Sequence, residues 1–120
     1  MPDNQVLDSE AIESLRALSP DDGGEFLREL IEVFLKDTPQ RLAELDQALA
    51  SLDAAVFTRA AHTIKGSSSN FGATRLSKLA QEIELLGKAG NLAGSAESCA
   101  RLKSEYALVV EALGKINKGT

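Results

Sequence analysis

The sequence predicts an all-α protein, an antiparallel up-down four-helix bundle with an additional short N-terminal helix. Apolar residues recur every three or four positions along most of the 120-residue chain. The 3 prolines and 9 glycines fall mostly where a helix would begin or end. No segment shows the apolar-polar alternation of a half-buried strand. The length suits one domain, so residues 1–120 are expected to form a single unit.

The short helix is expected over residues 8–18, with Ile12 and Leu15 on one face. The run Ser19-Pro20-Asp21-Asp22 then indicates a stop followed by a new helix start. Proline suits the first helical turn, and acidic residues suit the positive end of the helix dipole. The first long helix is therefore expected to begin near Gly24.

This first bundle helix is expected over residues 24–52, with Pro39 near its middle. Two interpretations compete, because proline removes one backbone donor: two helices with Thr38 as N-cap, or one kinked helix. The apolar stripe keeps its phase across the proline, which favours one helix. The stripe consists of Leu27, Ile31, Phe34, Leu42, Leu45, Leu49 and Leu52, with Thr38 at matching spacing between Phe34 and Leu42.

Three further bundle helices are expected over residues 53–70, 74–88 and 92–115. Asp53 is the expected N-cap of the first, and Gly72 its exit with positive φ. Gly87 to Asn91 is expected to form the turn before the last helix. Short loops between long amphipathic helices favour antiparallel neighbours. The stripes of the last two helices are Leu76, Leu79, Ile83 and Leu86, then Leu92, Ala96, Cys99, Leu102, Tyr106, Val109, Leu113 and Ile116.

The composition of the chain argues against several classes of function. The formal net charge of −5 argues against non-specific nucleic-acid binding, which needs an excess of Lys and Arg. The single cysteine, Cys99, cannot form an internal disulfide and suits a reducing compartment. No apolar run approaches the length of a membrane span, and one His with one Cys gives no metal-ligand spacing. We therefore expect a cytoplasmic protein with no metal or cofactor of its own.

The chemistry is concentrated on the helix over residues 53–70. Its inner face is expected to consist of Phe57, Ala60, Ala61, Ile64, Ser68 and Phe71. The opposite face then carries Thr58, Arg59, His62, Lys65, Gly66 and Ser69. His62 is the only histidine, and Lys65 lies one turn further along the same face.

Each of these residues has an ordinary explanation. A lone surface histidine is more often inert than functional, and Lys65 could be a plain solvated charge. Gly66 is harder to dismiss, because glycine inside a helix costs about 1 kcal/mol relative to alanine. Close approach of a neighbouring helix would also select glycine. On the exposed face, however, a missing side chain leaves space over the imidazole for a large partner.

Phosphoryl transfer gives the three residues a common purpose. Neutral imidazole is a good nucleophile near pH 7. Phosphorus is attacked in line, with charge spread over the equatorial oxygens, and a cation at Lys65 can reach those oxygens. The other ring nitrogen should be held by an acceptor that fixes the tautomer, and the adjacent helix is where we expect that acceptor.

The stretch from Ala61 to Ala73 (AHTIKGSSSNFGA) resembles the signature of histidine-containing phosphotransfer (HPt) domains, in which x-x-Lys-Gly, small residues and an apolar-Gly pair follow the histidine. The upstream residues 30–49 and the downstream Leu76, Leu79, Ile83 and Glu84 are similar to the family as well. The resemblance implies His62 as phosphoacceptor, Lys65 as the phosphate-neutralising cation and Gly66 as the clearance residue. Glu84 matches a family position that is often Gln. A carboxylate there could orient the histidine but would repel a phosphate.

The resemblance implies a relay protein of a two-component system, accepting a phosphoryl group from a receiver domain or kinase and passing it to another receiver. The expected partners are receiver domains of response regulators or hybrid histidine kinases. Any Mg²⁺ belongs to the receiver, and no kinase activity of its own is expected, since the chain has no Gly-rich phosphate loop. The docking face should include Thr58, Arg59 and Ser69.

Two other functions would also suit a helical bundle that carries a histidine. The first is the dimerisation helix pair of a sensor kinase, which also carries a histidine on a bundle. One chain here supplies four long helices, so a monomer is expected instead. The second is a non-catalytic helical adaptor that binds receivers or a sensor kinase without transfer. The intact set of His62, Lys65 and Gly66 argues against it.

Overall fold

The computed structural model describes residues 6–119, with side chains up to residue 117. In that range the chain is helical, without strands. Its elements are α1 (Ser9–Ala17), α2 (Glu25–Ser51), α3 (Ala54–Asn70), α4 (Thr74–Lys88), the 3₁₀ turn η2 (Ala93–Ser95) and α5 (Ala96–Gly119). The predicted all-α class is confirmed.

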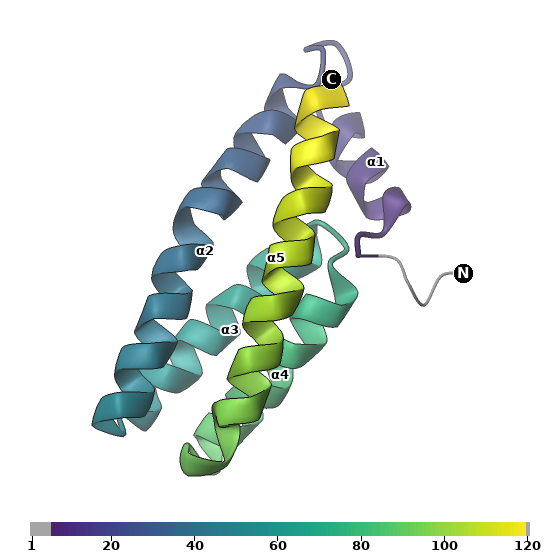
Figure 1. The fold of residues 1–120 in the computed structure, drawn as a ribbon. Coiled ribbons are helices and arrows are strands. Elements are labelled where there is room, and N and C mark those ends of the chain that lie inside the picture. The colour runs from purple at the N-terminus through teal and green to yellow at the C-terminus, as the bar shows by residue number, and fades with distance from the viewer. Residues whose placement is uncertain (1–5, 120) are drawn as a thin grey trace.

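Helices α2 to α5 form the bundle (Figure 1). Contacts run from α2 to α3, from α3 to α4, from α4 to α5 and back from α5 to α2, with α3 and α4 the most extensive pair. The long helices α2 and α5 extend beyond the shorter α3–α4 hairpin, and α1 lies beside their projecting ends. Consecutive helices run in opposite directions, as the short loops predict.

Helix α1 is attached to the turn between α3 and α4. The Asp8 backbone N–H donates to the Gly72 carbonyl oxygen at 3.0 Å, and the Asp8 side chain caps α1 by accepting from the Glu10 N–H. Gly72 has φ of +66°, and a Cβ at this position would lie 2.5 Å from the Asp8 Cβ. The turn therefore requires glycine for its backbone conformation and for the close approach of α1.

The core is mainly aliphatic and follows the predicted stripes. Its largest fully buried side chains come from all four bundle helices, and Phe34 packs its ring against Phe71 and Tyr106. Those side chains are Phe57, Leu27, Ile31, Leu45, Ile64, Leu76, Ile83, Leu102, Leu113, Val109, Thr38 and Ser68.

Helix α2 is continuous through Pro39, so the single-helix interpretation is correct. It ends one residue earlier than expected. Leu52 is the C-cap, in the left-handed region with φ of 58°, and it is 71% exposed. The predicted stripe therefore ends at Leu49. The left-handed cap turns Leu52 out of the helix, and the Asp53 side chain then accepts from the Val56 N–H to begin α3.

The start of the last helix is also different from the prediction. Residues Ala93–Ser95 form a 3₁₀ turn, and α5 begins only at Ala96. Ala96 is exposed, whereas Ser95 and Ser98 are buried. The phase counted from Leu92 fails here because a 3₁₀ turn rotates successive residues by more than an α-helix does.

We expect Leu45→Ala to lower the free energy of unfolding by about 2–5 kcal/mol, because Leu45 is 1% exposed and its removal leaves a cavity. Leu79 is only partly buried, so Leu79→Ala should lower the free energy of unfolding by less. Chemical denaturation of both variants checks this. Equal losses at the two positions would contradict the deeper burial of the Leu45 side chain.

Candidate functional site

The site lies on the α3–α4 hairpin, and α3 orients its central residue. Ala60, Ala61 and Ile64 are buried against the rest of the bundle. The helical repeat therefore turns His62 away from the core, and its side chain is 65% exposed. This is the orientation that the apolar pattern predicts.

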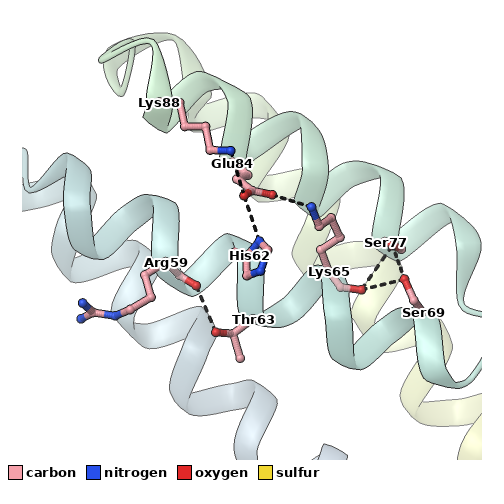
Figure 2. Close-up of polar contacts among 8 residues, drawn as sticks. All are labelled: Arg59, His62, Thr63, Lys65, Ser69, Ser77, Glu84 and Lys88. Carbon is pink, nitrogen blue, oxygen red and sulfur yellow. Dashed lines mark hydrogen bonds and ion pairs between the residues drawn. The ribbon is translucent and has the colours of Figure 1, made fainter.

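Glu84 on α4 holds the imidazole from the side of the bundle (Figure 2). Its carboxylate oxygen Oε2 lies 2.9 Å from His62 Nδ1. Glu84 is itself only 4% exposed, so it is a buried acid beneath an exposed histidine. The acceptor expected on the adjacent helix is therefore Glu84.

The electrostatics of Glu84 decide the tautomer of His62. A hydrogen bond from the Lys65 ammonium, supported by the bond to His62, lowers the pKa of Glu84 to about 2, although burial opposes this. The group is thus an ionised carboxylate near pH 7 and can only accept hydrogen bonds. Nδ1 must then carry the proton that it donates to Glu84, and the lone pair of a neutral ring is on Nε2.

Two lysines neutralise this buried carboxylate. Lys65 Nζ lies 2.9 Å from Oε1, and its side chain is 30% exposed. Lys88 Nζ lies 3.4 Å from Oε2, the oxygen that also binds His62, and its side chain is 62% exposed. In Figure 2 the lysines approach Glu84 from opposite sides. A buried charge requires such partners, because its desolvation is otherwise uncompensated.

Gly66 faces open space. A Cβ built at this position meets no atom within 4 Å, and the residue is exposed. Close approach of a neighbouring helix therefore does not account for the glycine. It lies one helical turn after His62, so its missing side chain keeps the surface beside the imidazole low.

The other predicted surface residues lie in two places. Thr58, Arg59 and His62 line a surface depression of about 490 Å³, together with Ala54, Ala55, Glu84 and Gly87. Ser69 is exposed but lies outside the residues that line this depression. Its hydroxyl is 2.9 Å from the Lys65 carbonyl oxygen and 2.9 Å from the Ser77 hydroxyl.

Two residues of this region were not singled out from the sequence. Gly87, expected in a turn, is buried in α4, where an added Cβ would clash with the Thr58 hydroxyl and lie 3.0 Å from the Phe57 ring. It sets the close approach of the two helices beside His62. Lys88 was missed as a site residue. The spacing of Glu84 and Lys88 by four residues was the available signal, since i and i+4 share a helix face.

Among the described residues, no group of three or more His, Cys, Asp or Glu is arranged to hold a metal ion. No helix in the described part of the chain has the length and apolar character needed to cross a membrane.

Known structures resemble this fold closely. Histidine-containing phosphotransfer protein B from Pseudomonas aeruginosa PAO1 is 28% identical, with a TM-score of 0.88 over 98% of each chain. The phosphotransfer protein MtHPt2 from Medicago truncatula is 26% identical, with a TM-score of 0.82 over 99% of this chain and 84% of that one.

Sequence comparisons agree with the structural ones. Multistep phosphorelay regulator 1 from Schizosaccharomyces pombe is 27% identical over 85 residues, which are 71% of this chain. The chain spans only 29% of the length of that relative. The Hpt domain family model matches residues 29–112, which contain α3, α4 and the whole cluster around His62. The chain therefore belongs to the Hpt domain family.

Proposed function

We propose that the protein is a phosphotransfer intermediate of a two-component phosphorelay, with His62 as the phosphoacceptor. One observation carries the proposal: the exposed imidazole is fixed through Nδ1 by a buried, ionised carboxylate, which leaves Nε2 as the nucleophile. Membership of the Hpt domain family and the likeness to phosphotransfer proteins support it.

The reaction follows from this geometry. Nε2 attacks the phosphorus of an aspartyl phosphate on a receiver domain, and an N–P bond forms as the P–O bond to the aspartate breaks. The aspartate leaves as a carboxylate with the bonding electron pair. No proton has to leave the attacking nitrogen, because Nε2 reacts through its lone pair. Transfer onward is the same reaction in reverse with another receiver.

Glu84 has a favourable and an unfavourable effect on this step. Attack by neutral imidazole leaves positive charge on the ring, and the carboxylate at Nδ1 stabilises that charge. The same carboxylate repels the phosphoryl oxygens. Lys65 offsets the repulsion, because its ammonium neutralises Glu84 and lies on the face that carries His62. We propose that it also stabilises the charge on the phosphoryl group.

The partners follow from the reaction. We propose receiver domains of response regulators or hybrid kinases, which would supply the aspartate and its Mg²⁺. The surface around His62, with the depression lined by Thr58 and Arg59, is the proposed docking area. A monomeric, cytoplasmic protein is part of the proposal, supported by the four bundle helices within one chain and the single cysteine. The alternative is an adaptor that binds receivers without phosphoryl transfer. Measurements of phosphoryl uptake by His62 variants distinguish the two functions.

His62→Gln should abolish phosphoryl uptake, because His62 is the only histidine in the chain. The fold should survive, since surface substitutions usually change stability by about half a kcal/mol or less. The measurement is acid-labile label on the protein after incubation with phosphorylated receivers, with circular dichroism as the control for folding. Acid-labile label on the variant would show that another residue is the acceptor.

Lys65→Ala should slow transfer roughly tenfold to a hundredfold, by removing one electrostatic contact to the phosphoryl group in a site open to solvent until docking. Receiver binding should change much less, because most of the docking face is unaltered. Transfer rates and receiver affinity, measured separately, check this. Equal losses in both would assign Lys65 to docking.

The same variant should be destabilised in a pH-dependent way. Lys65 is the main cause of the lowered pKa of Glu84, and a lowered carboxyl pKa stabilises the fold above the ordinary value of 4.5. That contribution is lost as pH falls through about 2. The stability gap between the native protein and Lys65→Ala should therefore be full near pH 7 and shrink below about pH 4.5. A gap independent of pH would contradict the ion pair.

Gly66→Gln should slow transfer by crowding the imidazole, while stability stays equal or rises, because Gln is a better helix former than Gly. Gly114→Gln on α5 is the matched control, since a Cβ there also meets no atom within 4 Å. Both variants should gain helix stability, and only Gly66→Gln should transfer slowly. Normal transfer by Gly66→Gln would remove the clearance role.

A further inference from the structure

Two cations, Lys65 and Lys88, contact the buried carboxylate of Glu84, and they differ in how freely they could move to a phosphoryl group on His62. Lys65 makes the shorter contact, 2.9 Å to Oε1, and is the less exposed of the two lysines. If its ammonium moved wholly to a phosphoryl group, Glu84 would lose the partner that contributes most to keeping it ionised. A buried charge that loses its partner is strongly destabilising. Lys65 can therefore act on the phosphoryl group only while it keeps its bond to the carboxylate.

Lys88 is placed differently. Its ammonium is 3.4 Å from Oε2, a longer contact, and its side chain is 62% exposed. It shares Oε2 with His62 Nδ1, whereas Lys65 binds the other oxygen (Figure 2). Withdrawal of Lys88 would leave Glu84 with both of its shorter contacts. The four-carbon stem of lysine gives this ammonium freedom to move over the edge of the ring.

The net charge of the cluster also favours a phosphoryl contact by Lys88. The lysines Lys65 and Lys88 against the single carboxylate of Glu84 leave one excess positive charge beside a neutral imidazole. A phosphoryl group brings negative charge to this cluster, and the excess cation offsets it. With Lys65 alone, the phosphorylated cluster would carry a net negative charge next to a buried acid. Lys88 therefore supplies the positive charge that remains to offset the phosphoryl group.

We propose that Lys88 is a second catalytic cation, which leaves Glu84 and contacts the phosphoryl oxygens on His62 while Lys65 keeps the carboxylate neutralised. This inference rests on His62 being the phosphoacceptor. The ordinary alternative is a surface ion pair between residues four apart near a helix C-terminus, which contributes little. The two differ in whether Lys88 affects phosphorylation.

The test uses phosphoramidate as donor, which separates chemistry from receiver docking. Nε2 forms its bond to phosphorus as the P–N bond of the donor breaks and ammonia leaves. Lys88→Ala should slow label uptake at His62 roughly threefold to tenfold, the range expected for a partly exposed charge contact. Lys88→Arg should restore much of the rate. Lys78→Ala is the matched control, an exposed lysine of the same helix away from the site.

A double variant separates phosphoryl contact from neutralisation of the acid. In a Glu84→Gln background there is no carboxylate to neutralise, so the proposal requires Lys88→Ala to slow uptake there as well. Equal rates for Lys88→Ala and Lys78→Ala, or loss of the Lys88 effect in the Gln background, would overturn it. Failure of the proposed relay function has a separate signature: label from phosphoramidate at His62 but none from any phosphorylated receiver.

Discussion

The site depends on one buried carboxylate that α4 holds beneath an exposed histidine of α3. Glu84 is 4% exposed and still ionised, because Lys65 and His62 donate to it from the neighbouring helix. A charge in that position is tolerated only while its partners stay in place. The constraint therefore fixes the imidazole orientation, the tautomer and the position of Lys65 together.

The contact between α3 and α4 must be close and precise for this arrangement to exist. Three features along α4 tie it to α3. Gly87 permits close contact with Phe57 and Thr58. Glu84 binds His62 and Lys65. The Ser77 hydroxyl donates to the Lys65 carbonyl oxygen at 3.3 Å. Packing beyond the hairpin then holds the pair, since α2 and α5 flank α3 and α4 respectively. The surface residue His62 thus takes its orientation from the hairpin packing.

In the proposed phosphotransfer role, an acid beneath His62 would suit a reversible carrier. A group that stabilises the ring cation favours attack and also keeps the imidazole a good leaving group, since the ring departs more easily while its Nδ1 is protonated. The repulsion between Glu84 and the phosphoryl oxygens acts in the same direction, against a long-lived phosphohistidine. Nearby lysines moderate that repulsion. A carrier between two receivers needs such a balance, because a phosphoryl group bound too strongly would not be passed on.

The helical class, the stripes that form the core and the exposed face with His62, Lys65 and Gly66 could all be predicted from the sequence. These follow from local periodicity, which depends only on the 3.6-residue repeat. The sequence also pointed to Glu84, although only through resemblance and with an uncertain role. The end of α2 at Leu52 and the start of α5 at Ala96 were not predicted correctly, because a left-handed cap and a 3₁₀ turn break the phase that periodicity assumes.

Tertiary structure alone decided how residues on two helices meet. The ionisation of Glu84 on α4 depends on the Lys65 ammonium and the His62 imidazole of the neighbouring helix α3, and no one-dimensional pattern gives the distances from these groups to its oxygens. The same holds for Gly87, whose glycine is required by Phe57 and Thr58 on another helix. Gly66 is the opposite case, a glycine that no neighbouring helix requires, and only the open space around it in the structure excludes a packing role. Periodicity assigns a residue to a face, whereas burial, charge and clearance depend on what the opposing helix places there.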